Sequence, residues 1–168
     1  MHTKAVFQGA KGLVRIGCAV LRFNFRGVGS SAGTFDDGPG ERADYTAALD
    51  FMHARYPDAP LWAAGFSFGS WMALETGAAD PRVSALIGIA PPVARDGYAF
   101  PLTRESTKPK FIVQGERDEL CAVTDMWKFY AQLHEPKELV VIDGADHLFD
   151  GKTTEVGDAL EDLLGDLE

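Results

Sequence analysis

A chain of 168 residues is long enough to form one domain with its own hydrophobic core. Hydrophobic residues make up 46% of it and charged residues 24%, an ordinary balance for a globular protein. With 25 acidic residues against 16 basic ones, the formal net charge is −9. This excess of negative charge argues against nucleic acid or an anionic membrane surface as a partner.

The sequence carries no recognisable targeting or membrane-spanning segment. No stretch reaches the roughly 18 uninterrupted apolar residues typical of a transmembrane helix, and the first residues lack the apolar run of a signal peptide. We therefore expect a cytoplasmic protein. Its two cysteines are Cys18 and Cys121. Cys18 falls in an apolar run, so we expect a buried thiol, and the chain offers too few ligands for a metal site.

Apolar residues recur at helix or strand spacing along the whole chain. We predict helices at residues 3–17, 41–56 and 68–76, around 123–130 and around 156–164. We predict strands at residues 18–24, 61–64, 84–90, 110–114 and 138–142. The segments 26–40 and 93–109 are predicted to be irregular. Strands that alternate with helices predict a single α/β domain over residues 1–168, an open and mostly parallel sheet with helices on both faces.

The pentapeptide Gly65-Phe66-Ser67-Phe68-Gly69 stands between a predicted strand and a predicted helix. A turn this tight holds its central residue in a strained conformation and lifts the side chain off the sheet edge. The flanking glycines allow the strand and helix backbones to approach closely. The helix directs its first N–H groups at Ser67, so the N–H of Phe68 can stabilise an oxyanion. We predict a nucleophilic Ser67, although the pentapeptide alone is also compatible with a simple glycine-rich turn.

A serine nucleophile needs a base, and in open parallel sheets the site forms at the carboxyl ends of the strands. His147 follows the last predicted strand and is the candidate base. The other histidines are terminal or lie in or beside predicted helices: His2, His53 and His134. The alternative interpretation of His147 is a structural histidine in its loop.

The base in turn needs a carboxylate that holds its orientation. Asp118 follows the strand predicted at residues 110–114, and we rank it first, although a turn or helix-capping aspartate is the alternative. Its rivals are Glu116, Asp96 and Asp146. The resulting order along the chain is nucleophile, acid and base.

This order, with the GFSFG turn, the GERDE turn and the GADH loop, resembles the alpha/beta-hydrolase superfamily. The stretch LRFNFRGVGSSAGTFD is similar to its small lid-less bacterial serine hydrolases of the dienelactone hydrolase and esterase kind. The resemblance covers essentially the whole chain. It implies Ser67 as nucleophile, His147 as general base and Asp118 as the orienting carboxylate, with the Phe68 N–H as an oxyanion donor. It implies no metal or organic cofactor.

The resemblance also implies that the segment from Asn24 to Gly27 lies near the mouth of the site. We predict substrate contacts for Asn24, Arg26, Gly27 and Phe66. An apolar acyl pocket could be lined by Phe66, Phe68, Phe100 and Trp71, with core packing as the better interpretation of Trp71. Arg26 and Arg95 could bind an anionic group, or they could pair with surface acids such as Asp36 or Asp37.

In one respect the sequence departs from the proteins it resembles. Such hydrolases normally carry more chain before the first helix, including a central strand and a loop that supplies a second oxyanion N–H. Here the helix begins at once, which indicates a shortened chain with a gap in the sheet between residues 18–24 and residues 61–64. Loss of one oxyanion donor lowers the rate about a hundredfold or more, so we expect weakened activity.

We therefore predict a serine hydrolase that cleaves small carboxylic esters or thioesters through an acyl-enzyme intermediate. The alternative is a catalytically impaired or inactive hydrolase-like remnant, with a binding role or none. A peptidase ranks lower, because the chain offers no extra domain of the kind such peptidases use. The expected partner is a small-molecule acyl ester, and an unpaired strand edge could also pair across a homodimer.

Overall fold

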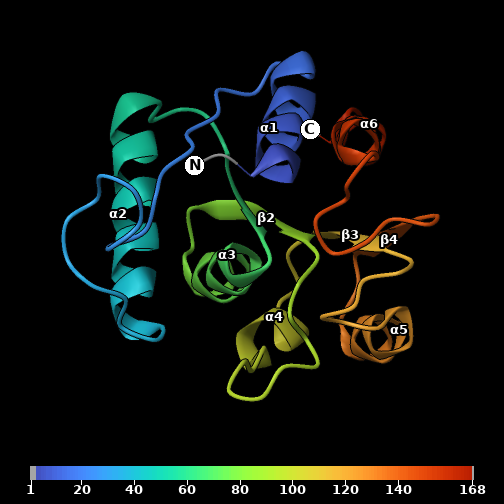
Figure 1. The fold of residues 1–168 in the computed structure, drawn as a ribbon. Coiled ribbons are helices and arrows are strands. Elements are labelled where there is room, and N and C mark those ends of the chain that lie inside the picture. Colours follow the sequence, from blue (N-terminus) through green and yellow to red (C-terminus); the bar gives the residue numbers. More distant parts are fainter. Residues whose placement is uncertain (1–2, 168) are drawn as a thin grey trace.

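A four-stranded sheet flanked by helices forms the centre of the computed structural model, which describes residues 3–167 (Figure 1). Its strands are β1 (Leu61–Phe66), β2 (Val83–Ile89), β3 (Lys110–Gly115) and β4 (Lys137–Ile142). The strand order is β1-β2-β3-β4, and each neighbouring pair is parallel. The predicted open parallel sheet is confirmed, while His2 lies outside the described residues.

Helices cover both faces of this sheet, as Figure 1 shows. On one face lie α1 (Lys4–Arg15) and α6 (Thr153–Leu164). On the other lie α2 (Pro39–Arg55), α3 (Phe68–Ala79), α4 (Pro101–Glu105) and α5 (Val123–Gln132). Successive residues of a strand face opposite sides, so Leu86 of β2 enters the core under α3 while Ile87 enters the core under α1 and α6. Within residues 3–167, no helix has the length and hydrophobicity needed to cross a membrane.

One short helix was not anticipated. Residues 93–109, predicted to be irregular, contain α4, which begins with Pro101 at its first turn. The buried carboxylate of Glu75 on α3 accepts the N–H of Thr103 (2.9 Å) and its hydroxyl (2.7 Å). This carboxylate satisfies donors that a helix start leaves without internal partners, so α4 depends on a contact that is distant in sequence.

The strand predicted at residues 18–24 is wrong. This segment forms neither helix nor strand, and residues 19–24 make no backbone-to-backbone hydrogen bond with the rest of the described chain. A strand exists only through pairing with a neighbour, and the nearest strand, β1, is separated from the segment by a groove of about 690 Å³ that both line. β1 is thus an edge strand, whose Ala64 carbonyl accepts the hydroxyl of Tyr45 (2.9 Å).

Candidate active site

Ser67 occupies the turn between β1 and α3. Its backbone has φ 51° and ψ −122°, a conformation that is strained for a residue other than glycine. Three backbone hydrogen bonds hold it there. The Ser67 N–H donates to the carbonyl of Ile89 on β2 (2.9 Å), and the Ser67 carbonyl accepts the N–H groups of Ser70 (2.9 Å) and Trp71 (3.3 Å). The predicted strand–turn–helix around the serine is therefore present.

The two glycines that flank this turn have different roles. A Cβ on Gly65 would collide with the carbonyl of Gly69 and would lie 2.6 Å from the backbone nitrogen of Ser70. A Cβ on Gly69 would meet only the ring of Phe25, at an ordinary contact distance of 3.8 Å. The close approach of the strand and helix backbones therefore requires glycine at position 65 but not at position 69.

We expect Gly65→Ala to lower the free energy of unfolding by about 3 kcal/mol, because the added methyl group has no room to move away from the helix backbone. Gly69→Ala is the matched control and should change it by no more than about 0.5 kcal/mol, since alanine favours the helix. Urea unfolding of the two variants measures the difference. Equal effects would show that the close approach at Gly65 does not govern the turn.

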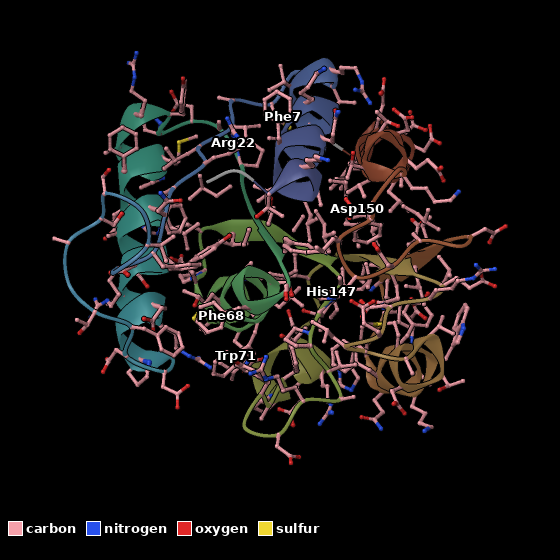
Figure 2. The ribbon with its side chains drawn as sticks, in the orientation of Figure 1. Phe7, Arg22, Phe68, Trp71, His147 and Asp150 are labelled. Carbon is pink, nitrogen blue, oxygen red and sulfur yellow. The ribbon has the colours of Figure 1, made fainter. Side chains whose placement is uncertain are left out.

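The three residues predicted as nucleophile, base and acid lie in one hydrogen-bonded chain. The Oγ of Ser67 is 2.9 Å from Nε2 of His147, and Nδ1 of His147 is 2.8 Å from Oδ2 of Asp118. They follow β1, β4 and β3 respectively, so the carboxyl ends of three strands supply one side chain each. His147 and Asp118 are buried, and Figure 2 shows His147 on the loop after β4, directed toward the middle of the molecule.

Asp118 is held by backbone as well as by the imidazole. Its Oδ1 accepts the N–H groups of Leu120 (2.8 Å) and Cys121 (2.9 Å), which leaves Oδ2 to face His147. Burial acts to raise the pKa of the Asp118 carboxyl, but the hydrogen bonds from His147 and from these N–H groups outweigh it. The pKa therefore lies below its ordinary value, and the carboxylate is ionised at neutral pH.

None of the rival carboxylates is hydrogen-bonded to the imidazole within residues 3–167. Glu116 accepts the backbone N–H of Gly144 (2.7 Å), and Asp146 accepts the backbone N–H of Asp150 (2.9 Å). Asp96 is exposed in the segment before α4. Another carboxylate, which we did not anticipate, belongs to Glu119, whose Oε2 accepts the backbone N–H of His147 (3.2 Å). Glu116, Asp146 and Glu119 thus accept backbone N–H groups of the histidine loop, whereas Asp118 binds the ring.

The first N–H of α3 belongs to Phe68, directly after the serine. The initial N–H groups of a helix have no acceptor within the helix, and they lie at its positive end. The arrangement therefore offers an N–H beside Ser67 for developing negative charge, and the role of Phe68 as oxyanion donor stays a prediction.

The structure places only some of the predicted substrate residues beside the triad. The ring of Phe66 packs 5.3 Å from the imidazole of His147, between ring centroids. Arg26 is engaged elsewhere, because its guanidinium pairs with Asp44 (2.8 Å) and its backbone N–H binds the same carboxylate (2.9 Å). Its acidic partner is therefore neither Asp36 nor Asp37.

Asn24 and Gly27 lie on the irregular segment beside the groove. Asn24 is one of the groove residues, and its carbonyl accepts the hydroxyl of Ser31 (3.1 Å). The N–H of Gly27 donates to Ala32 in a turn with φ 70° at the glycine. Both residues help to shape this segment through backbone bonds, and no hydrogen bond among residues 3–167 joins them to the triad.

The proposed acyl-pocket aromatics divide into two groups. Phe66 and Phe68 line the groove, but Phe100 and Trp71 are buried in the core under α3. Phe100 packs against Phe129, and the indole N–H of Trp71 donates to the carbonyl of Ala99 (2.8 Å). The prediction of a pocket role is wrong for Phe100, whereas core packing was already the favoured interpretation of Trp71. Arg95 lies over the ring of Tyr98.

The groove beside β1 extends from α1 to the serine turn. Its wall is mainly apolar, and it includes Val20, Phe23 and Ile89 together with residues of the turn itself. At the end near α1, the guanidinium of Arg22 lies 5.2 Å from the ring centre of Phe7. Both residues are labelled in Figure 2. The groove lies between residues 18–24 and β1, but residues 18–24 form no strand, so the sheet ends at β1 and the expected gap between two strands is not present.

Comparison with known proteins gives concordant matches over nearly the whole chain. Residues 1–166 match a family model described as an alpha/beta hydrolase domain. A Rickettsia prowazekii protein is 38% identical over 171 residues, which cover 98% of this chain and 72% of that protein.

Two solved structures are also closely similar. An alpha-beta serine hydrolase homologue from Coxiella burnetii has a TM-score of 0.91 and 38% identity, with 98% of this chain and 77% of that one covered. A serine hydrolase without lid from Xanthomonas campestris has a TM-score of 0.87 and 35% identity, with 98% and 73% covered. The chain thus spans about three quarters of the length of each relative.

Proposed function

This chain belongs to the alpha/beta-hydrolase family, and on that premise we propose that it is a serine hydrolase that cleaves small carboxylic esters or thioesters. The observation that carries the proposal is the hydrogen-bonded chain from Ser67 through His147 to Asp118, with distances of 2.9 and 2.8 Å. Nucleophile, base and orienting carboxylate are the groups that acyl transfer to serine requires. Two solved relatives above 30% identity are themselves described as serine hydrolases or homologues of them.

In the proposed reaction, Nε2 of His147 takes the proton of Ser67 as Oγ attacks the carbonyl carbon of the ester. The N–H of Phe68 donates to the oxyanion, and Asp118 stabilises the imidazolium that forms. His147 then gives its proton to the leaving alcohol or thiol, which leaves an acyl group on Ser67. Water, deprotonated by the same imidazole, releases the acid and restores the serine.

Small substrates are favoured by what surrounds the nucleophile. In the connection from β2 to β3 the only helix is the five-residue α4, which is fixed against α3 by Glu75 and is too short to form a separate helical cover. The ring of Phe66 and the half-exposed Leu148 provide apolar surface near the imidazole. The similar Xanthomonas campestris protein is described as a hydrolase without lid.

The direct test is labelling with a fluorophosphonate probe, which phosphonylates only an activated serine. We expect the intact mass of the wild-type protein to increase by one adduct, and we expect no increase for Ser67→Ala. Ser70→Ala is the matched control, because Ser70 lies on the same turn with its hydroxyl bound to the carbonyl of Ser67, and it should keep the adduct.

A folded wild-type protein that takes up no adduct would contradict the proposed hydrolase and favour the inactive alternative. The groove beside β1 gives that alternative its structural support. The turn that carries Ser67 continues from an edge strand, which has a neighbour on one side only within residues 3–167. An adduct on Ser70→Ala but not on Ser67→Ala would assign the nucleophile.

A further inference from the structure

A glutamine lies buried beside the carboxylate of the proposed triad. Gln114 is the next-to-last residue of β3 and is fully buried. Its Nε2 donates to Oδ2 of Asp118 (3.0 Å) and to the carbonyl of Cys121 (3.0 Å). The same Oδ2 also accepts a hydrogen bond from the Nδ1–H of His147. Gln114 thus shares with the imidazole one oxygen of the carboxylate.

The direction of the amide follows from its neighbours. All three groups within hydrogen-bond distance of Nε2 are acceptors: the carboxylate oxygen of Asp118, the carbonyl of Cys121 and, at 3.4 Å, the carbonyl of Gly115. An amide turned by 180° would direct its own oxygen at these oxygens and be repelled by them. Gln114 therefore acts as a donor to Asp118.

Stability alone does not account for a glutamine at this position. Its Oε1 is buried and has no hydrogen-bond partner among residues 3–167. A buried acceptor without a partner is destabilising, whereas methionine fills a similar volume and buries no polar atom. The neighbouring positions of β3, Ile112 and Val113, are apolar and fully buried. A polar side chain here therefore suggests a role in the site.

We infer that Gln114 is a positioning residue, which holds Oδ2 of Asp118 against the imidazole and shares the negative charge of that oxygen. The inference rests on the proposed function and names a residue outside the triad that tunes it. Two backbone N–H groups fix Oδ1, so among residues 3–167 Oδ2 is held by Gln114 and His147 alone. Without the amide, the imidazole is the one donor to that oxygen left in the described part of the chain.

Two effects of removing the amide follow. The carboxylate becomes freer to turn, so the imidazole is less well oriented toward Ser67 and kcat falls. At the same time Oδ2 keeps more of its negative charge, which favours the protonated imidazole, so the acid limb of the rate profile moves to higher pH. The carboxylates of Glu116 and Glu119 bind backbone N–H groups of the histidine loop, and the substitution leaves them in place.

The test is Gln114→Met, with ester hydrolysis and urea unfolding measured from pH 5 to 9. We expect kcat to fall about tenfold, the rate equivalent of one lost hydrogen bond to a charged group, with KM nearly unchanged. We also expect the acid limb to move to higher pH and the stability to change little, because the substitution removes the unpartnered Oε1 but also the donor to the carbonyl of Cys121. Lost activity with the acid limb moved to lower pH would support positioning but contradict charge sharing.

Lys110→Met is the matched control on the same strand. Lys110 is equally buried, but its Nζ donates to the carbonyls of Lys108 and His134. It is the first residue of β3, whereas Asp118 follows the other end of that strand. This variant should lose stability and leave the pH profile unchanged. If Gln114→Met behaves in the same way, with lower stability and an unchanged profile and kcat, Gln114 is structural and the inference is overturned.

An NMR titration separates this inference from the proposed function. If wild-type protein takes no fluorophosphonate and hydrolyses no ester, the proposed function fails. The ring-carbon resonances of His147 still report its titration midpoint in wild type and in Gln114→Met. A moved midpoint supports the contact between Gln114 and the Asp118–His147 pair, and an identical midpoint overturns it.

Discussion

Replacement of His147 by alanine is expected to lower kcat for a small ester by about a millionfold, the loss that follows when a triad histidine is removed from a serine hydrolase. The reason lies in the 2.9 Å contact between Nε2 and Oγ of Ser67, which is the only route by which a base in the described structure reaches that hydroxyl. Without it the serine keeps its proton and is a poor nucleophile. Hydrolysis of p-nitrophenyl acetate, corrected for background, measures the change.

Because His147 is buried, alanine also leaves a cavity, and unfolding could imitate a catalytic effect. His147→Gln keeps most of the volume and should lose nearly as much activity while its urea midpoint stays close to that of the wild type. The control is His134→Ala, since that side chain is exposed and outside the site. If either variant at position 147 retained a rate within tenfold of the wild type, the base would have to be sought elsewhere.

The core of the site could be predicted from the sequence because each part is encoded locally. Ser67 is marked by a strand, a glycine and a helix in immediate succession, and His147 and Asp118 each follow an apolar strand. In a parallel sheet, all such ends meet at one edge, so no long-range information was needed to bring them together. The sequence alone does not separate Asp118 from Glu116, because both follow the same strand. The structure does, because the carboxylate of Glu116 accepts the backbone N–H of Gly144 instead of binding the imidazole.

The errors concern contacts between distant parts of the chain. Residues 18–24 have the composition of a strand, but composition does not supply a neighbour, and the described structure gives them none. The helix α4 begins at Pro101, a visible start signal, yet its first turn is stabilised by Glu75, which is remote in sequence. Phe100 looked like a pocket residue and is instead fixed in the core by Phe129.

Gln114 illustrates a third kind of limit. A polar residue at the end of an otherwise apolar strand is visible in the sequence, but many such residues simply reach solvent. Only the structure shows that the amide turns inward, donates to Asp118 and leaves its own oxygen without a partner. The signal that could have found it is its position near the end of β3, four residues before the aspartate.

Asp118→Asn is the second substitution with a large expected effect, a fall in kcat of about ten thousandfold. The N–H groups of Leu120 and Cys121 continue to hold the amide oxygen, so the new NH₂ group faces His147. The NH₂ group of the asparagine and the Nδ1–H of His147 would then be two donors facing each other. The imidazole therefore adopts the tautomer with its proton on Nε2. In that tautomer Nε2 no longer accepts the proton of Ser67, although the heavy atoms remain in place.

The same substitution should flatten the acid end of the stability profile. The folded-state pKa of Asp118 lies below its unfolded value, about 3.9, so the ionised carboxylate stabilises the fold above that pH. This contribution is lost as the pH falls through the lower, folded-state pKa. The difference in unfolding free energy between wild type and Asp118→Asn should therefore be largest near neutral pH and shrink below about pH 4.

Glu119→Gln is the matched control for both measurements, because Glu119 binds only the backbone N–H of His147 and is exposed. It should keep a rate within about tenfold of the wild type, since the ring retains its partner and its tautomer. If Glu119→Gln and Asp118→Asn lost activity equally, the position of the histidine loop would matter more than the tautomer of the ring. A much larger loss for Asp118→Asn assigns the orientation of the imidazole to the carboxylate that contacts it.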